Sequence, residues 1–152
     1  MDDYQVFEDI GHKDTNSQSP RISGYKKIRT HLIFDVKHDG RHKARMVADG
    51  HLTDIPLDSV YSGVVSLRGL RLLIFLAELN NLDTWATDIG NAYLEAETSE
   101  KVYIYAGPEF GKLENHILII RKALYGLRTS GVRWHERLAD CLRQMRFKPC
   151  FA

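Results

Sequence analysis

The sequence predicts an α+β fold in which short strands and two amphipathic helices follow one another without an internal repeat. Three observations support this class. Runs rich in β-branched and aromatic residues flank an Asp39-Gly40 turn, and apolar residues take helical spacing first in 67–77 and again in 134–145. The chain has 152 residues, of which 43% are hydrophobic and 27% charged. That composition is typical of one globular domain with a modest core.

Residues 1–24 carry Gly, Asp, Asn, Ser and Pro with few apolar residues, so we expect a linker or flexible arm without core residues. The acidic start differs from the basic and then apolar start of a signal peptide. The sequence also lacks the run of about 18 uncharged apolar residues that marks a membrane span. These features predict an intracellular protein with no membrane partner. Cys141 and Cys150 are expected to be reduced thiols.

The next segment predicts a β-hairpin, because His31–Val36 and Lys43–Ala48 are β-rich runs joined through Asp39-Gly40. Lys43 and Arg45 alternate along the second run and therefore project to one face. Basic residues on an edge strand either prevent unwanted pairing or bind phosphate, and the residues by themselves favour neither role.

A helix is predicted behind Ser66 as the N-cap, with its end near Asn80-Asn81. Thr84–Ile89 alternates in the manner of a short strand, which would place Asp88 near the strand end. Val102–Tyr105 and Ile117–Ile120 predict a second hairpin with a long connection. The last helix is indicated by five apolar residues at helical spacing: Trp134, Leu138, Cys141, Leu142 and Met145.

Charge is distributed unevenly although the formal net charge is only +1. Segment 21–50 has eight Lys/Arg and three Asp/Glu. Segment 51–100 has two Lys/Arg and eight Asp/Glu, and segment 121–152 has eight Lys/Arg and two Asp/Glu. Two basic regions around an acidic one would suit a phosphate-binding cleft beside metal-binding carboxylates. On charge alone, solvated surface faces explain the pattern better.

Four sequence blocks together carry a family resemblance: KARMVADGH (43–51), TDIGNAYLEA (87–96), VYIYAGPEF (102–110) and KALYGLRTSGVRW (122–134). Their order and spacing resemble the Ty1/copia retrotransposon reverse transcriptase domain from about Tyr25 to the last residue. The resemblance implies the fingers (about 25–83) and the first part of the palm (about 84–152) of a right-hand polymerase. Residues 1–24 would then be an irregular N-terminal arm.

The resemblance implies that Asp88 is a catalytic aspartate and an Mg²⁺ ligand, with the carbonyl group of Ile89 on the same metal. Two divalent ions clamp the attacking and leaving oxygens in such enzymes, which requires hard carboxylate ligands. Without that context, a lone aspartate in this position is more often a turn or cap residue.

Nucleotide-binding roles are implied for Lys43, Arg45, Tyr93 and Gly126. The ring of Tyr93 matches the steric gate that excludes a ribose 2′-hydroxyl, although a single tyrosine is by itself better read as a core aromatic. Lys43 and Arg45 match the strand that contacts the triphosphate. Gly126, in the block 124–128 that packs against base and template, would permit close approach.

Nucleic-acid contacts are implied for Lys37, Arg128 and Arg133, for which ordinary solvated or helix-end charges are the alternative. The chain departs from the family in 128–131, where Arg-Thr-Ser-Gly replaces the usual Lys-Gln-Ser-Pro and leaves the entry to the last helix less fixed. Asp49 also replaces a usual lysine.

The family's Tyr-Val-Asp-Asp hairpin, which supplies the other metal carboxylates, does not occur in these 152 residues. We therefore expect a fragment of an RNA-directed DNA polymerase that is inactive alone, with an apolar strip exposed along 84–89 or the last helix. Template-primer, dNTP and the remaining half of the polyprotein are the implied partners. The implied location is the cytoplasm, in a virus-like particle, or the nucleus.

Three alternatives remain open. The chain is a non-catalytic nucleic-acid-binding module, a decayed retroelement fragment without function, or a metalloprotein that uses His38, His42 and His51. The histidines have no helical spacing and no cysteine pair beside them, which favours solvated side chains over metal ligands.

Overall fold

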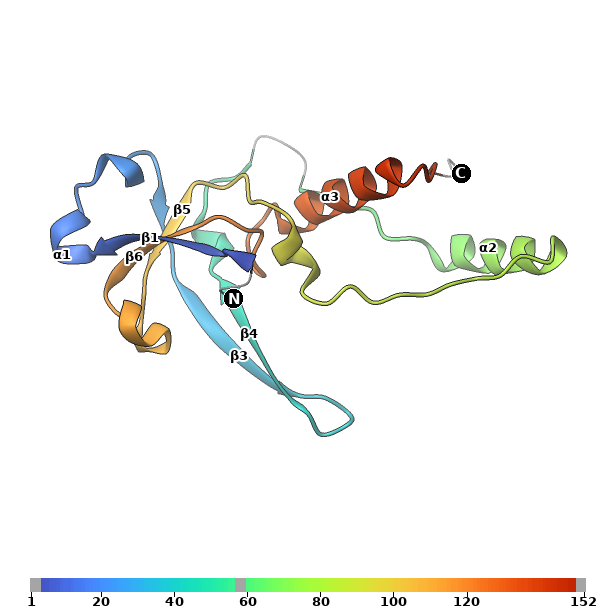
Figure 1. The fold of residues 1–152 in the computed structure, drawn as a ribbon, viewed down its shortest axis with the longest axis horizontal. Helices are drawn as coiled ribbons and strands as arrows, with labels where there is room; N and C mark the ends of the chain where they lie inside the picture. The colour runs from blue at the N-terminus through green and yellow to red at the C-terminus, as the bar shows by residue number, and fades with distance from the viewer. Residues whose placement is uncertain (1–3, 57–59, 150–152) are drawn as a thin grey trace.

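The computed structural model, which describes residues 4–56 and 60–149, combines a four-stranded mixed sheet with a separate two-stranded hairpin (Figure 1). The sheet order is β1-β6-β5-β2, with β1 at Phe7–His12, β6 at His116–Ile120, β5 at Val102–Tyr105 and β2 at Lys26–Lys27. β1 and β5 both run antiparallel to β6, and β2 pairs in parallel with β5. The α+β class and the β5–β6 pairing predicted from sequence are confirmed.

The predicted first hairpin is also confirmed and consists of β3 (Thr30–Val36) and β4 (His42–Ala48), paired in antiparallel register from Thr30↔Ala48 to Val36↔His42. The backbone N–H of Gly40 donates to the carbonyl of Lys37 over 2.8 Å, and Gly40 has the positive φ of 78° that a tight turn requires. Lys37 thus lies in the turn, one residue beyond β3. The hairpin projects away from the sheet (Figure 1).

Helix α2 (Leu67–Leu79) begins as predicted behind Ser66, whose hydroxyl accepts a hydrogen bond from the N–H of Gly69 over 3.0 Å. It ends at Asn80, whose side chain donates to the carbonyl of Leu76 over 2.7 Å. The second predicted helix is α3 (Ser130–Gln144). The shorter helical segments are α1 (Lys13–Asn16) and the 3₁₀-helices η2 (Pro20–Ile22), η3 (Gly50–Leu52), η4 (Ala92–Glu95) and η5 (Pro108–Leu113).

The strand predicted for Thr84–Ile89 is wrong. Residues 82–89 follow an extended path without any strand pairing among the described residues, and the side chain of Trp85 is 95% exposed. An alternating pattern becomes a strand only where a neighbouring backbone completes its hydrogen bonds, and none lies beside this segment in the described part of the chain. Asp88 therefore lies on an extended connection and not at a strand end.

The expectation that residues 1–24 contribute no core is likewise wrong for the described residues 4–24. Strand β1 is an edge strand of the sheet, and the side chain of Val6 is 1% exposed within the main core cluster. Ile22 packs with Ile117 and Ile119 on the other side of the sheet. This segment is a structural part of the sheet and not a loose arm.

Strand β6 lies at the centre of the core, since its residues from Ile117 to Ile120 are all at most 1% exposed. One face of the sheet packs against the base of the hairpin and the segments around η4 and 123–127. The buried residues of that cluster are Val6, Ile28, Met46, Ala48, Leu94, Val102, Ile104, Ala106, Leu118, Ile120, Leu124 and Leu127. The core thus joins the hairpin base to the sheet.

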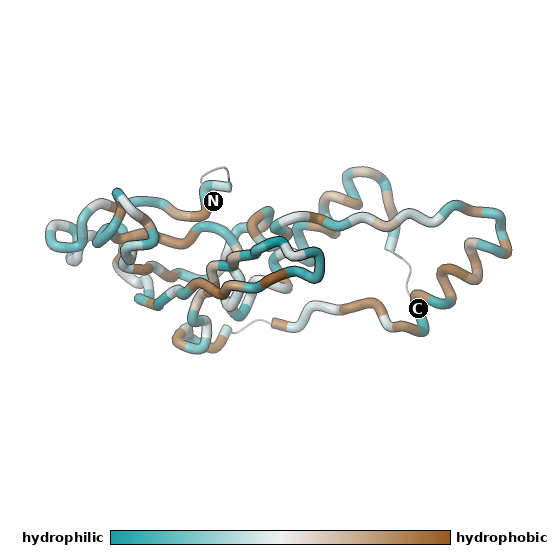
Figure 2. The backbone as a smooth tube through the Cα atoms, turned by 90° about the horizontal axis from the view of Figure 1, so that it is seen from below, coloured by the Kyte–Doolittle hydropathy of each residue, from teal (hydrophilic) through white to brown (hydrophobic). Residues whose placement is uncertain are grey.

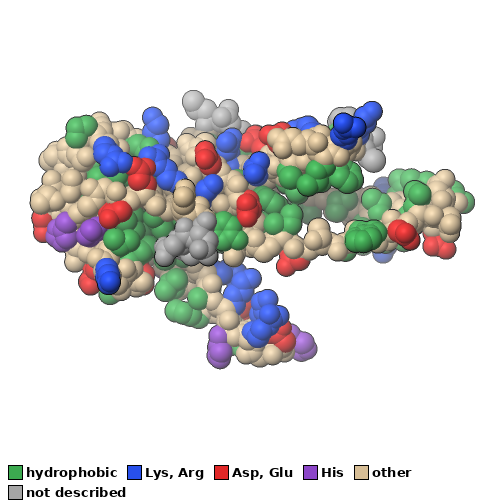
Figure 3. Space-filling model, viewed as in Figure 1, with side chains coloured by type: hydrophobic (Ala, Val, Ile, Leu, Met, Phe, Trp, Pro, Cys, Tyr) green, Lys and Arg blue, Asp and Glu red, His purple; other side chains and the backbone are tan. Residues whose placement is uncertain are grey.

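Helix α2 and its flanking extended segments form an arm that projects from this body (Figures 1 and 2). Apolar side chains on α2 are exposed, and so are Ile89, Leu142 and Met145, as expected for an apolar strip along 84–89 and α3. Figure 3 shows apolar groups gathered on α2 and on the facing side of α3. Among the described residues, no helix is long and apolar enough to cross a membrane.

Candidate functional site

A small cavity of about 170 Å³ lies where strand β4 faces the segment between α2 and η4. A cavity of this size is smaller than the roughly 300–1,000 Å³ of a site that encloses a drug-sized ligand. It therefore has room for a small polar group and not for a whole drug-sized ligand. The lining residues are Lys43, Ala44, Arg45, Met46, Asp88, Ile89, Gly90, Asn91, Leu94 and Tyr125.

The cavity brings together four residues singled out in the sequence. Lys43 and Arg45 come from β4, while Asp88 and Ile89 come from the extended segment after α2. Arg45 pairs with Asp35 on the neighbouring strand over 3.6 Å, and in the described part of the chain no cation lies within ion-pairing distance of Asp88. Positive and negative groups thus line the same small space without neutralising each other directly.

Two tyrosines stand side by side next to this cavity, and Tyr93 is not itself among the lining residues. Tyr93 is in η4, and its ring centroid lies 4.8 Å from that of Tyr125, with the ring planes tilted by 43°. Tyr125 lines the cavity, and both rings are half-buried. Sequence reasoning singled out Tyr93, included Tyr125 only as a member of the block 124–128, and missed Asn91. Asn91 adopts a left-handed conformation with φ 53°, and its place between Gly90 and Ala92 was the only local signal for that turn.

Gly126 permits close approach, but the approach is to the chain's own backbone. Gly126 has φ 92°, and a β-carbon there would overlap the carbonyl oxygen of Ala48 at the end of β4. A β-carbon on Gly50 would in turn overlap the carbonyl oxygen of Gly126. The two glycines let the 123–127 segment pack directly onto the hairpin base.

The arginines expected to contact nucleic acid are engaged within the chain. The Arg128 guanidinium donates to the carbonyl of Gly50 over 3.0 Å. The Arg133 guanidinium donates to the carbonyl of Glu97 over 3.3 Å and pairs with Glu136 over 2.8 Å. Both arginines are part-exposed, so these contacts position their charges at the surface. Lys37 is exposed at the hairpin turn.

The entry to α3 is more firmly held than the loss of the family's proline suggested. One carboxylate oxygen of Glu100 accepts hydrogen bonds from both the backbone N–H and the hydroxyl of Thr129, each over 2.9 Å. The hydroxyl of Ser130 donates to the carbonyl of Leu124 over 2.6 Å. Side-chain hydrogen bonds therefore fix this turn where the family has a stiff residue.

The described residues do not fit a complete metal site. Within 4–56 and 60–149, no group of three His, Cys, Asp or Glu side chains is arranged to hold a metal ion. His38 and His42 flank the hairpin turn, whereas His51 lies in η3. Asp49, which stands where the family has lysine, pairs with Arg29 over 3.4 Å and with His31 over 3.0 Å. Asp88 is the carboxylate that lines the cavity.

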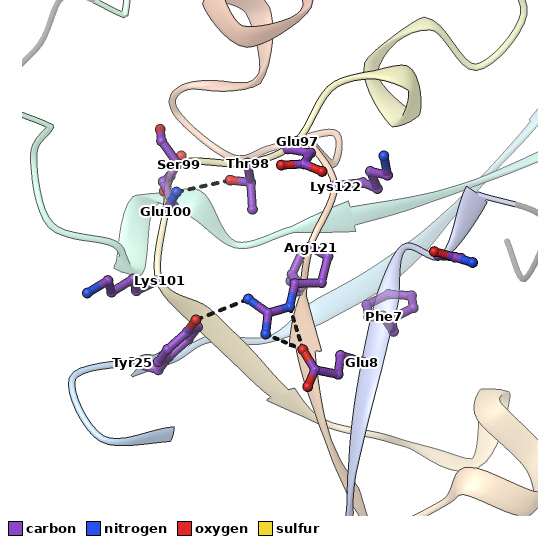
Figure 4. Close-up of a pocket in the computed structure, with 12 residues that line it drawn as sticks. Phe7, Glu8, Tyr25, Glu97, Thr98, Ser99, Glu100, Lys101, Arg121 and Lys122 are labelled. Carbon is purple, nitrogen blue, oxygen red and sulfur yellow. Dashed lines mark hydrogen bonds and ion pairs between the residues drawn. The ribbon is translucent and has the colours of Figure 1, made fainter. Parts of the chain in front are cut away.

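A larger polar pocket of about 700 Å³ lies at the β1–β6 end of the sheet, and none of the predicted site residues lines it (Figure 4). Its floor is an ion-pair network in which Glu8 contacts the guanidinium groups of Arg121 and Arg21, while Arg121 also donates to the hydroxyl of Tyr25. The hydrogen bond to Glu8 holds the pKa of Arg121 above its usual value. This network fastens β1 to the end of β6, while Lys101 and Lys122 line the pocket without an ion-pair partner among the described residues.

Comparison with protein families finds a match to the family described as "Reverse transcriptase (RNA-dependent DNA polymerase)" over residues 16–152. Among curated proteins, the Transposon Ty1-DR4 and Ty1-DR6 Gag-Pol polyproteins of Saccharomyces cerevisiae are each 36% identical over 125 residues, which is 81% of this chain. The matched region is 8% and 7% of those polyproteins, so the chain spans less than a tenth of their length. No solved structure matches the chain significantly.

Proposed function

The chain belongs to the reverse transcriptase (RNA-dependent DNA polymerase) family, and on this premise we propose that it is a segment of a Ty1/copia-type RNA-directed DNA polymerase that carries part of the nucleotide-binding site. The observation that supports this most is the cavity where Lys43 and Arg45 meet Asp88 and Ile89. Residues from distant parts of the sequence share one space there, in the combination that a sugar, a triphosphate and a metal require.

Each group has a separate role in this proposal. Lys43 and Arg45 bind triphosphate oxygens, because charge-assisted hydrogen bonds are the strongest that a side chain offers to phosphate. Tyr93 excludes ribonucleotides by the bulk of its ring, and Asp88 with the Ile89 carbonyl supplies metal ligands. Gly126 shapes the nucleotide site through the packing of its segment on β4. Lys37, Arg128 and Arg133 contact template or primer phosphates.

The family implies Mg²⁺, yet the chain offers one carboxylate at the cavity where a two-metal site needs several. We therefore propose that these residues do not catalyse nucleotide transfer by themselves. The further carboxylates come from outside the 152 residues. The same outside segment covers the apolar surfaces of α2 and α3, which would make the rest of the polyprotein the principal partner.

In this proposal, residues 25–83 belong to the fingers and residues 84–152 to the palm. The packing of β1 against β6 adds residues 4–24 to the body of the domain, so they are not a separate arm. The proposed location is the cytoplasm, within a virus-like particle, or the nucleus.

A second candidate function is a nucleic-acid-binding module without catalysis. The observation in its favour is the hairpin, where Lys37 and Lys43 have no acidic side chain within ion-pairing distance among the described residues. The acidic residues Asp35 and Asp39 are paired with Arg45 and Arg41 instead. The hairpin therefore keeps unpaired positive charge for phosphate.

One experiment with two readouts tests the proposal. Titration of the purified chain with dATP and Mg²⁺ should show binding that weakens by about tenfold or more in a Lys43→Ala, Arg45→Ala double variant, since each contact to a charged group is worth roughly 1.5–3 kcal/mol. Lys112→Ala, which removes an exposed lysine of η5, is the matched control. In parallel, template-primer extension should give no product with wild type or with Asp88→Asn.

Two results contradict the proposal in different ways. Equal binding by the double variant and by wild type would remove the nucleotide-binding role of the cavity. Primer extension that is present in wild type and lost in Asp88→Asn would show that the metal ligands are complete within these residues. Salt-sensitive binding of RNA or DNA without any dATP binding would favour the non-catalytic module.

A further inference from the structure

We infer that Tyr125 positions the ring of Tyr93 and thereby sets how strongly the cavity discriminates deoxyribonucleotides from ribonucleotides. The inference rests on the proposed function, because it takes Tyr93 as the ring that excludes a 2′-hydroxyl. Its geometric basis is the ring pair, with centroids 4.8 Å apart and planes tilted by 43°. Tyr125 is a positioning residue in this scheme, since it acts through Tyr93.

The backbone of Tyr125 is fixed to the hairpin base. Its carbonyl accepts a hydrogen bond from the N–H of Ala48 over 2.7 Å, and Tyr125 forms an isolated parallel bridge with Val47. The following residue, Gly126, lies so close to Ala48 that no side chain fits between them. The backbone position from which the Tyr125 ring extends is therefore fixed at the end of β4. This strand also carries Lys43 and Arg45.

The backbone of Tyr93 is held by a local hydrogen bond from the N–H of Ala96 to the Tyr93 carbonyl over 3.0 Å. It lies in η4, a 3₁₀-helix of only four residues that begins after Asn91 in its left-handed conformation. The hydroxyl of Tyr93 lies near the start of α3, where a β-carbon added to Gly131 would lie 4.0 Å from the Tyr93 hydroxyl oxygen and 3.0 Å from the hydroxyl oxygen of Ser62. The ring of Tyr125 packs against that of Tyr93, and in this scheme that contact sets the tilt of the Tyr93 ring.

The contact links a residue that lines the cavity, Tyr125, to the ring of Tyr93 beside it. Tyr125 itself lines the cavity together with Lys43, Arg45 and Asp88, so a shift of the hairpin that moves β4 also moves Tyr125 and the ring it touches. A tilted aromatic pair stabilises its paired arrangement by about two- to tenfold in population. Loss of the pair should lower sugar discrimination by a similar factor.

The test compares the affinities of dATP and ATP, each titrated with Mg²⁺ into the full chain. In Tyr125→Leu, the ratio of the two affinities should fall by about two- to tenfold, while Tyr125→Phe should keep the wild-type ratio because the ring remains. Tyr105→Leu is the matched control, since it removes a tyrosine whose ring contacts are with Tyr103 and Lys27 on the sheet. Its ratio should not change.

A second measurement follows the Tyr93 ring without any nucleotide. Fluorotyrosine at position 93 should give a ¹⁹F resonance displaced from its unfolded position in wild type and in Tyr125→Phe, because the neighbouring ring lies 4.8 Å away. A resonance at the unfolded position in the folded wild-type chain would overturn the inference even if Tyr125→Leu does not fold.

The binding outcomes separate this inference from the proposed function. An unchanged ratio in Tyr125→Leu beside a lowered ratio in Tyr93→Ala overturns the positioning role and leaves the gate intact. A ratio that Tyr93→Ala does not change, or no nucleotide binding by wild type, overturns the proposed function and this inference with it.

Discussion

Leucine side chains have opposite surroundings in the sheet and on α2, although both segments are rich in apolar residues. Leu118 in β6 is fully buried, whereas Leu72 on α2 is 54% exposed. The sheet finds its partners within the described residues, because β6 lies between β1 and β5 and under the hairpin base. Helix α2 carries apolar residues around most of its circumference, which is typical of a helix enclosed on several sides. The sheet thus buries its apolar residues within the described chain, whereas α2 leaves its apolar residues exposed.

The largest expected effect is the difference between two matched leucine truncations. Leu118→Ala should lower the free energy of unfolding by about 2–5 kcal/mol, because it leaves a cavity in the core. Leu72→Ala should change it by only about 0.5 kcal/mol, the usual range for a surface position. Urea unfolding followed by circular dichroism measures both. Similar losses in the two variants would break the comparison and show that α2 is covered in solution.

A second prediction tests whether the exposed apolar residues of α2 cause the chain to self-associate. Leu73 and Leu76 are 56% and 45% exposed, and burying such side chains between molecules is worth about 1.5–3 kcal/mol each. Leu73→Glu with Leu76→Glu should raise the concentration at which the chain self-associates by at least about tenfold. Sedimentation velocity measures the concentration at which the chain self-associates. Ser23→Glu with Ser99→Glu adds the same charge at exposed positions off the arm and should leave association as in wild type. Wild type that stays monomeric at high concentration would contradict the prediction.

The smallest effect is expected at the turn of the β3–β4 hairpin. Like α2, this hairpin projects from the body, but its turn residues are polar. Hydrogen bonds from the Arg41 side chain, and then from its backbone N–H, hold the pKa of Asp39 below its usual value. Arg41→Ala should therefore raise the Asp39 pKa, as measured by carboxyl ¹³C NMR titration. Because the folded-state pKa is the lower one, the pair stabilises the fold above the unfolded-state pKa of Asp39. That stabilisation is lost as the pH falls through the folded-state pKa. An unchanged titration in Arg41→Ala, or the same change in Arg68→Ala, would contradict the pairing.

Much of the fold was predictable where the signal is local. The Asp39-Gly40 turn, the Ser66 cap and the spacing of apolar residues in α3 each specify an element within a few residues. The failures concern long-range pairing. Phe7–His12 is polar and looks irregular, yet it pairs with β6, while Thr84–Ile89 alternates and finds no partner in the described chain. Strand formation depends on a neighbour that the local sequence does not reveal.

The sequence blocks predicted that some of the candidate residues lie close together, while the roles of these residues stay predictions. Lys43, Arg45, Asp88 and Ile89 share a cavity as the order of motifs indicated. The place of Tyr125 depends on the packing of two glycine-containing segments, Gly50 and Gly126, which no periodicity encodes. The hydrogen bonds from Arg128 to Gly50 and from Arg133 to Glu97 were missed for a similar reason, since these acceptors are backbone carbonyl groups far along the chain.

The pairing of β1 with β6 has a consequence for synthesis. Glu8 and Arg121, which bridge these strands, are 113 residues apart. At roughly 5–20 residues per second of translation, β1 emerges on the order of ten seconds before its partner strand exists. During that interval it is an unpaired strand in a crowded cell. Glu8, Asp9 and Gly11 make β1 a poor partner for another exposed strand. The polar residues that make this strand hard to predict from the sequence therefore also protect the nascent chain from wrong strand pairing until β6 has been synthesised.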